Sequence, residues 1–162
     1  MTFYSASEEL KRKKPGIHIY EFDGSSATVE EAANVLQVEP ARIAKTLAFK
    51  VGESAVLVVA AGDTKIDNAA FKKQFGVKAK MLSAEELTTY TSHPIGGVTP
   101  FGLAEKCAVF IDESLNRFET VFPACGSTNS AVELTPAEFL MYIEDAQKVD
   151  VCKGWRAEVN QL

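Results

Sequence analysis

Apolar residues recur at helical spacing, at i, i+3, i+4 and i+7, in residues 29–36. A second amphipathic segment covers residues 136–143, where Pro136 occupies the first helical turn. Each segment follows a Thr-x-x-Glu capping box, whose side chains accept hydrogen bonds from the free amides at a helix start. A third box, with serine as its first residue, lies in the middle of the chain. The pattern therefore predicts three helices, which begin after Thr28, Ser83 and Thr135.

Short stretches rich in β-branched and aromatic residues predict strands between these helices. They cover residues 17–22, 46–51, 55–61, 77–81, 108–111, 118–122 and 131–134. Some of these strands follow one another directly and others are separated by helices, so we expect a mixed α/β fold. No repeat or linker divides the 162 residues, and 46% hydrophobic content suffices for one buried core. We therefore expect a single domain over residues 1–162.

The charge balance limits how this chain could bind nucleic acid. A net charge of −5 at pH 7 has the wrong sign for binding by electrostatics alone, so an RNA contact has to be local, and no DNA partner is expected. The candidate basic patches are residues 11–14, residues 72–73, and Lys78 with Lys80. The ordinary interpretation of each patch is a solvated face.

Several other classes of protein are disfavoured by what the sequence lacks. The longest apolar run, residues 55–61, is much shorter than the roughly 20 residues of a membrane span, and no apolar stretch follows the first basic residues. We therefore expect a cytoplasmic protein with no membrane segment. Three widely spaced cysteines and two histidines match no disulfide or metal motif, and no glycine-rich nucleotide fingerprint is present. We expect no metal and no cofactor.

Lys45 is the first candidate for chemistry. If residues 46–51 are extended, the period of two places Lys45 on the same side as Leu47, Phe49 and Val51. A lysine on an apolar face either extends its ammonium to water at a strand end, which is the commoner outcome, or lines a cavity that holds an anionic ligand.

Two loops are the other candidates. Residues 93–102 combine glycines, which allow close backbone approach, with prolines and apolar residues, a composition that suits a small apolar pocket as well as an ordinary turn. Residues 125–130 form a polar cluster, for which a plain hairpin connection is the simpler interpretation. No Ser-His-Asp arrangement or G-x-S-x-G motif is recognisable, so a catalytic triad is not supported.

Together these places resemble the YbaK-like aminoacyl-tRNA editing family, which includes the editing domain inserted in many bacterial prolyl-tRNA synthetases. The resemblance runs from about residue 17 to 143 and depends on the order and spacing of short motifs. These are Ile17-His18-Ile19-Tyr20-Glu21, Lys45-Thr46-Leu47, Gly62-Asp63-Thr64-Lys65-Ile66-Asp67, the G-x-x-x-P loop at 96–100 with Phe101-Gly102, Ile111-Asp112 and Cys125-Gly126-Ser127. It implies a mixed, partly barrel-like sheet flanked by helices.

The resemblance further implies a trans-editing deacylase that hydrolyses the ester of a small amino acid mischarged on tRNA, with tRNA for proline as the expected carrier and a synthetase as a further partner. Lys45 would face a phosphate or sugar at the 3′ acceptor end, and Gly102 would help to stabilise the oxyanion. A ribose hydroxyl of the substrate would assist the attacking water, so no nucleophilic side chain is needed. The residues expected to contact the substrate are Tyr20, Gly96, Gly97, Pro100, Phe101, Gly126, Ser127 and Asn129.

Departures from the family leave alternatives open. The cysteine-specific branch has a serine before its Gly-Gly and Lys-Arg-Gly after it, whereas this chain has Ala124 and Ser127-Thr128-Asn129. The amino acid removed therefore stays open among alanine, cysteine, serine and 2-aminobutyrate. A non-catalytic tRNA- or nucleotide-binding regulator with the same fold is the main alternative, and a Schiff-base enzyme that uses Lys45 is another. Residues after about 148 are expected to form a terminal strand or tail.

Overall fold

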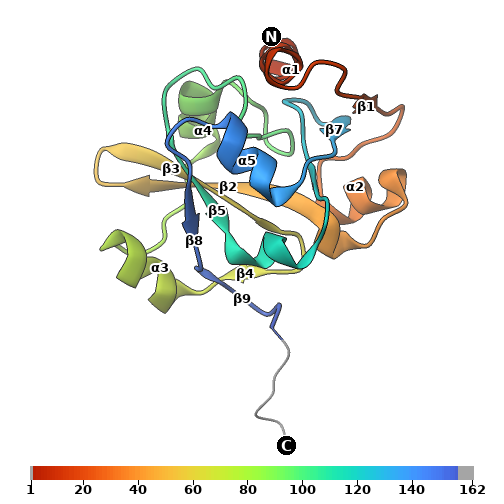
Figure 1. The fold of residues 1–162 in the computed structure, drawn as a ribbon. Helices are drawn as coiled ribbons and strands as arrows, with labels where there is room; N and C mark the ends of the chain where they lie inside the picture. The colour runs from red at the N-terminus through yellow and green to blue at the C-terminus, as the bar shows by residue number, and fades with distance from the viewer. Residues whose placement is uncertain (1, 157–162) are drawn as a thin grey trace, which may run out of the picture.

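The central feature of the fold is a five-stranded mixed sheet (Figure 1), seen in a computed structural model that describes residues 2–156. The sheet curls into a half-barrel. Its strands, in spatial order, are β6 (Phe122–Pro123), β2 (Ile43–Val51), β3 (Ser54–Ala61), β5 (Ala108–Asp112) and β8 (Gln147–Val149). The β2–β3 hairpin is antiparallel, and the other three neighbouring pairs are parallel. The expected mixed α/β, partly barrel-like architecture is confirmed.

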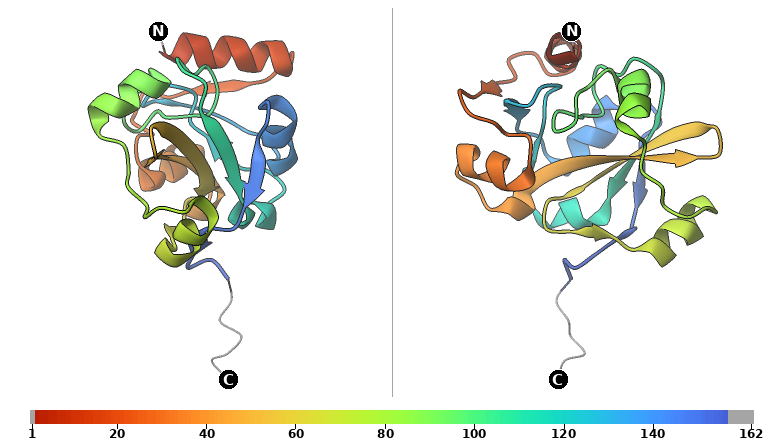
Figure 2. Two further views of the ribbon diagram at one scale, coloured as in Figure 1. Left: turned by 90° about the vertical axis from the view of Figure 1, so that its left-hand side faces the viewer. Right: turned by 180° about the vertical axis from the view of Figure 1, so that it is seen from behind.

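Two small antiparallel pairs lie beside this sheet. One joins β1 (Ile19–Glu21) to β7 (Ser130–Val132), and the other joins β4 (Lys65–Ile66) to β9 (Cys152–Lys153). The helices are α1 (Thr2–Lys13), α2 (Val29–Leu36), α3 (Asn68–Phe75), α4 (Ala84–Thr91) and α5 (Pro136–Tyr142), with 3-10 turns η1 (Pro40–Arg42) and η2 (Glu113–Arg117). In the further views, α1 and α3 lie at opposite ends of the molecule (Figure 2). None of the helices in residues 2–156 is long and apolar enough to span a bilayer.

The three predicted helices are confirmed, with their capping boxes. In each box the threonine or serine oxygen accepts from the glutamate amide, and the glutamate carboxylate accepts from the cap amide. Helices α1 and α3 were not predicted, because neither begins with such a box. In α1 two apolar residues one turn apart, Ala6 and Leu10, are fully buried, while α3 is capped by Asp67 and buries Phe71.

Two predicted strands are wrong. Residues 77–81 make only one bridge to the sheet, between Met81 and Phe49, because Val77 and Met81 are exposed and give the segment no apolar face to bury. Residues 118–122 form a strand only from Phe122, since η2 runs to Arg117 and the amide of Phe118 still donates to the carbonyl of Leu115 at its end. The first predicted strand also shortens, from 17–22 to β1.

The central sheet is covered on both faces. Along β3, Leu57 and Val59 pack in one core with Phe101 and Phe139, while the intervening residues pack in a second core around Phe71. This alternation follows from the period of two in a strand. It divides β2 in the same way, with small side chains toward the first core and large ones toward the second.

Candidate functional site

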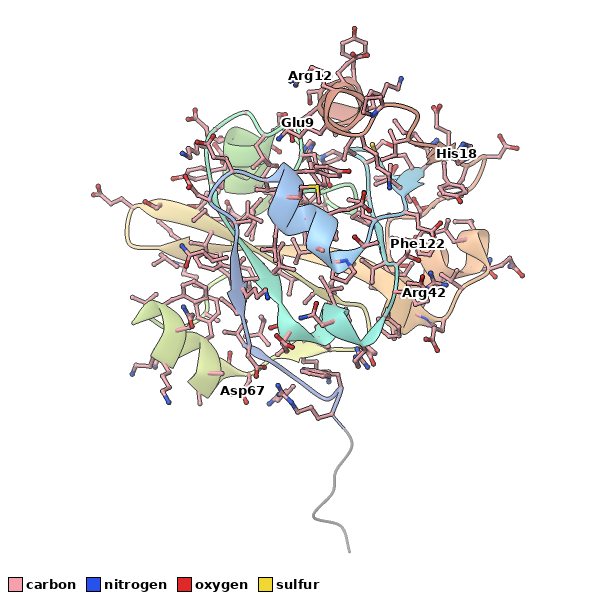
Figure 3. The ribbon with its side chains drawn as sticks, in the orientation of Figure 1. Glu9, Arg12, His18, Arg42, Asp67 and Phe122 are labelled. Atoms are coloured by element: carbon pink, nitrogen blue, oxygen red, sulfur yellow. The ribbon has the colours of Figure 1, made fainter. Side chains whose placement is uncertain are left out.

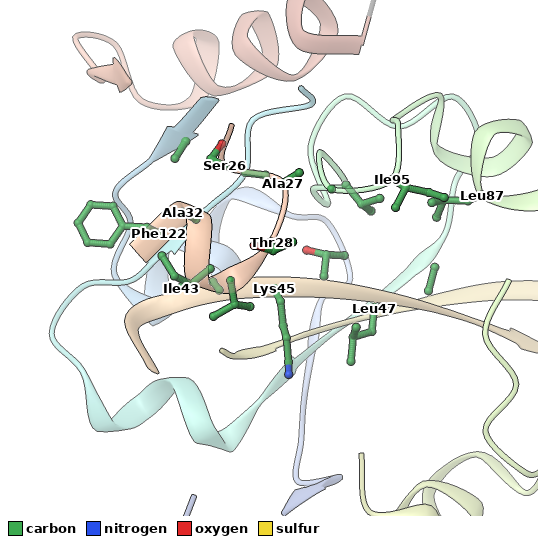
Figure 4. A pocket seen from close by; sticks show the side chains of 18 of the residues that line it. Ser26, Ala27, Thr28, Ala32, Ile43, Lys45, Leu47, Leu87, Ile95 and Phe122 are labelled. Atoms are coloured by element: carbon green, nitrogen blue, oxygen red, sulfur yellow. The ribbon is translucent and has the colours of Figure 1, made fainter. Parts of the chain in front are cut away.

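A pocket of about 340 Å³ lies over the first half of β2 (Figure 4). Its walls are mostly apolar, and they come from segments far apart in the sequence, which is typical of a ligand site. The lining residues are Ser26, Ala27, Thr28, Val29 and Ala32 around the start of α2; Ile43 to Ala48 of β2; Met81, Leu82, Ala84 and Leu87 around α4; Ile95, Gly96 and Val98; and Phe122, Ala124, Ser130 and Ala131.

The pocket exists because one edge of β2 is open for three residues. β6 pairs with β2 only as far as Ala44, and on the same edge the amide of Leu82 next donates to the carbonyl of Ala48, at 3.0 Å. Between these two attachments, residues 45–47 have no neighbouring strand on that edge. The side chains that face the pocket from β2, at positions 44, 46 and 48, are small, so the space above them stays empty.

Thr46 presents unsatisfied polar groups at this opening. Its side-chain oxygen is buried and has no hydrogen-bond partner. Ala48 and Lys50 direct backbone groups to the segment 80–82, and because alternate residues of a strand point the same way, the backbone N–H and C=O of Thr46 point toward the open edge. Buried polar atoms are nearly always paired, so an unpaired hydroxyl in a pocket indicates a place for a polar ligand atom.

Lys45 lines the floor of the pocket but directs its ammonium away from it. In Figure 4 its side chain extends on the side of the strand opposite to Ala27 and Ile95. The ammonium donates a hydrogen bond to the carbonyl oxygen of Thr64. Burial lowers the pKa of Lys45, and the nearby Asp63 partly opposes this effect. The sequence places Lys45 on the same side of the strand as Leu47, and Leu47 packs against the second core.

Asp63 itself is engaged by another cation. The two terminal guanidinium nitrogens of Arg117 donate to the Asp63 carboxylate, at 2.7 and 3.0 Å, and this bidentate hydrogen bonding is the main cause of the lowered pKa of Asp63. Lys45 is therefore not held by a dedicated carboxylate partner, and its ammonium is available to an incoming anion at the cost of one hydrogen bond to a carbonyl.

The two candidate loops contact each other. The amide of Gly126 donates to the carbonyl of Gly97 at 3.0 Å. A Cβ on Gly97 would lie within 2.9 Å of the Ser127 backbone, and one on Gly96, whose φ is +85°, would lie 2.7 Å from the Cβ of Ala27. Glycine is thus required at both positions for the backbones to meet. The contact closes the end of the pocket where Gly96 lines it.

The residues after Gly97 are placed differently from Gly96. Pro100 and Phe101 are buried, and the Phe101 ring stacks on Phe139 in the first core. Gly102 has a φ of +63°, and a Cβ there would lie 2.4 Å from the backbone of Ala6 in α1. None of these three lines the pocket. The close contact with α1 by itself explains why residue 102 is a glycine. The role of Gly102 in stabilising an oxyanion stays a prediction.

The remaining predicted residues surround the pocket without lining it. Tyr20 lies opposite Ala131 in the β1–β7 pair, with its ring edge-on to Phe122 at 6.3 Å. Ser127 donates to the side chain of Asn129, and the Asn129 amide donates to the carbonyl of Phe22. Of the ten predicted site residues, Lys45 and Gly96 line the pocket.

Thr46 belongs to the motif Lys45-Thr46-Leu47 but was not among the predicted site residues. The signal that could have revealed it is the alternation of Ala44, Thr46 and Ala48 with larger residues, which indicates a strand with one hollow face.

Neither metal nor thiol chemistry is indicated in the part of the chain that the structure describes. Residues 2–156 contain no group of three or more histidine, cysteine or acidic side chains placed to hold a metal ion. Cys107, Cys125 and Cys152 are all buried and free. Burial raises the pKa of both Cys125 and Cys152 to about 12, so these thiols stay protonated near neutral pH and are poor nucleophiles.

This geometry coincides with a known family. The family model of the aminoacyl-tRNA editing domain matches residues 23–142, which include the whole pocket lining. The chain belongs to the aminoacyl-tRNA editing domain family, which confirms the resemblance seen in the motifs.

Individual relatives agree with this assignment. The chain is similar to YwhH of Bacillus subtilis (strain 168), an uncharacterized protein, with 54% identity over 85% of this chain and 88% of YwhH. The proline–tRNA ligase of Geobacillus sp. (strain WCH70) is 30% identical over 78% of this chain, a region that makes up 22% of the ligase. A crystal structure reported for a candidate trans-editing enzyme for prolyl-tRNA synthetase has a TM-score of 0.85 and 27% identity, covering 94% of this chain and 98% of the other.

Proposed function

We propose that this protein is a trans-editing deacylase, which hydrolyses the ester between a small amino acid and the 3′ end of a tRNA. The observation that carries the proposal is the mostly apolar pocket at the open stretch of β2, beside Lys45, in a chain of the editing family. The similarity to a proline–tRNA ligase and to a candidate trans-editing enzyme favours tRNA for proline as the carrier. The protein would act in the cytoplasm as one domain over residues 1–162.

The pocket would hold the amino acid. Its walls are apolar apart from a few groups such as Thr46, Ser26 and Ser130, and such a surface suits a small side chain. The hydroxyl and the outward-facing backbone groups of Thr46 would bind the polar part of the aminoacyl group, which fixes the ester at the open edge. Fixing the reacting groups in this way lowers the entropic barrier to attack by water.

Lys45 would bind the nucleotide side of the ester. Its ammonium lies on the other face of β2, where it would exchange the carbonyl of Thr64 for a terminal phosphate or sugar oxygen. The hydrogen bond of the ammonium to the Thr64 carbonyl is already charge-assisted, and a phosphate oxygen would add the attraction of an opposite charge. The substrate's ribose hydroxyl would position water, and the Gly102 amide stays the proposed oxyanion donor. A synthetase or the acceptor stem would select the tRNA.

A panel of tRNAs charged with alanine, cysteine, serine or proline tests the proposal. The protein should release amino acid from at least one mischarged tRNA, and Lys45→Ala should lower that rate by about 100-fold, the loss expected when a positioning charge is removed. Lys50→Ala is the matched control, because Lys50 lies on the same strand but is exposed and paired with Glu86. Inactivity on every member of the panel would instead favour the non-catalytic binding protein.

A further inference from the structure

A second surface, outside the pocket, carries uncompensated positive charge. Residues 65–80 contain five lysines and one aspartate, although the whole chain has a net charge of −5. That aspartate, Asp67, uses one carboxylate oxygen to accept from the amides of Ala69 and Ala70 at the start of α3. With Lys153 from β9, the lysines form what we call the α3 surface: Lys65, Lys72, Lys73, Lys78, Lys80 and Lys153, all exposed.

In the other basic segment of the chain, residues 11–14, two of the lysines are paired with carboxylates. At the end of α1, Lys13 lies 3.7 Å from Glu9 and Lys14 lies 2.9 Å from Glu138. Among the described residues, no lysine of the α3 surface lies within ion-pair distance of a carboxylate. The two basic segments are at opposite ends of the molecule, as the positions of Arg12 and Asp67 show (Figure 3).

Two lysines of the α3 surface are placed where they repel each other. In the β4–β9 pair, Lys65 lies directly opposite Lys153. Like charges at directly opposed positions of an antiparallel pair destabilise it. An anion that binds between them would remove this repulsion, so the arrangement favours an anionic partner.

The α3 surface is also hollowed. A depression of about 490 Å³ is lined by Asn68, Ala69, Lys72, Lys78 and Ala79. Two ammonium groups and one side-chain amide at the rim of a depression can hold an oxyanion such as a phosphate group. Lys72 and Lys78 therefore line a concave site, whereas the lysines of an ordinary solvated face do not.

Lys45 connects the α3 surface to the pocket. Its ammonium emerges on the face of β2 that packs against α3, and Lys65 is close enough for its charge to act on Lys45. A polyanion that lies along the α3 surface would therefore reach Lys45 and then the open edge of β2.

We propose that the α3 surface binds the phosphate backbone of the tRNA whose 3′ end enters the pocket. This inference rests on the proposed function, and it names the part of the protein that holds the RNA outside the pocket. Because RNA is a regular array of phosphates, contacts by single lysines add to affinity without reading sequence.

The test compares two double variants, Lys72→Ala with Lys78→Ala on the α3 surface, and Lys11→Ala with Arg12→Ala on α1 as the matched control. Binding of uncharged tRNA for proline is measured over a range of salt concentrations. The α3 variant should bind about tenfold or more weakly, and the magnitude of its slope of log K against log salt should fall by roughly 1.4 to 1.8, since each of the two lost phosphate contacts removes about 0.7 to 0.9. The α1 variant should match the unmodified protein.

Deacylation kinetics separate this inference from the proposed function. The α3 variant should show a raised KM at low salt while kcat changes by less than about twofold, as expected when binding is lost equally in the ground state and the transition state. If the α3 variant binds tRNA with unchanged affinity and slope, the inference is overturned. If the unmodified protein binds tRNA through the α3 surface but hydrolyses no mischarged tRNA, the surface stands and the deacylase proposal fails. Equally tight, salt-dependent binding of poly-glutamate would overturn the assignment to RNA in favour of an acidic protein.

Discussion

The two faces of β2 show how one strand serves two purposes. Toward the second core it directs Leu47 and Phe49, and the Phe49 ring lies 4.8 Å from that of Phe71 in α3. Toward the pocket it directs Ala44, Thr46 and Ala48, whose side chains end close to the backbone. Large residues on one face anchor the strand, and small residues on the other leave room for a ligand. The stability of the sheet and the opening of the site are thus assigned to different side chains.

This division predicts that stability and activity can be changed separately. A change on the core face should affect the free energy of unfolding and leave the chemistry of the folded fraction intact. A change on the pocket face should do the reverse, because the pocket is already empty and holds little of the packing energy.

The largest effect is expected from Phe71→Ala on the core face. Phe71 is fully buried and contacts both Phe49 and Phe75, with ring centroids 4.8 and 4.5 Å apart. Truncation should lower the free energy of unfolding by about 3 to 5 kcal/mol, measured by urea denaturation. Activity per folded molecule should stay within about twofold at low temperature. An active-site defect in the folded variant would show that the two faces are coupled.

The sequence identified the helices of this fold better than its strands. The capping boxes at Thr28, Ser83 and Thr135 are local signals, because the same few residues make the hydrogen bonds that define the helix start. The segment 77–81 had a suitable composition but bridges β2 only at Met81, and pairing depends on residues far away in the chain. Local patterns carry no information about that.

Only some of the predicted site residues line the pocket. Lys45 and Gly96 belong to motifs and line the pocket, while their contacts with a substrate stay predictions. Gly102 and Phe101 belong to an adjoining motif but contact α1 and α5, and a motif alone cannot distinguish a glycine needed for a ligand from one needed for helix packing. The hydroxyl of Thr46 became a candidate only when its lack of a partner was visible.

The next largest effect is expected from filling the pocket with Ala124→Leu. Ala124 lines the pocket and is only half-buried, so a larger side chain would extend into the cavity rather than into the core. Deacylation should fall by about 100-fold, or roughly 2.7 kcal/mol of transition-state stabilisation, if the amino acid binds there. Ala137→Leu, on the exposed surface of α5, adds the same atoms as a control. Full activity of Ala124→Leu would place the amino acid elsewhere.

A sharper test of the pocket face is Thr46→Val, which replaces the hydroxyl with a methyl group of similar size. The oxygen is buried and unpaired in the free protein, so its removal should raise the free energy of unfolding by about 1 kcal/mol. The rate of deacylation should fall about tenfold, because the ester loses a hydrogen bond. Thr46→Ser should restore most of the rate. A variant that is less stable and fully active would mean that the hydroxyl supports the fold.

The smallest expected effect is a dependence of the free energy of unfolding on pH that arises from His93, beside the pocket. His93 begins the loop that carries Gly96; it is fully buried, its Nε2 donates to the carbonyl of Phe101 at 2.8 Å, and its Nδ1 has no partner. Burial lowers the pKa of His93 below the ordinary value of 6.5, with the contact to the Phe101 carbonyl opposing this shift. Below pH 6.5 the unfolded chain therefore takes up a proton that the folded protein resists.

The resulting contribution to stability is fully present above pH 6.5 and decreases as the pH falls toward the lowered pKa of the folded state. Between pH 7 and 5.5 the free energy of unfolding should therefore drop, with a slope from this group of at most about 1.4 kcal/mol per pH unit, the limit for one proton. His93→Gln keeps a donor for the Phe101 carbonyl without a group that titrates, so its denaturation midpoint should change less over this range. An identical pH profile in both proteins would show that the loop tolerates a charged imidazole. The pocket wall would then adapt to a buried charge, whereas the aromatic core on the other face of β2 is expected to lose stability when a side chain is changed.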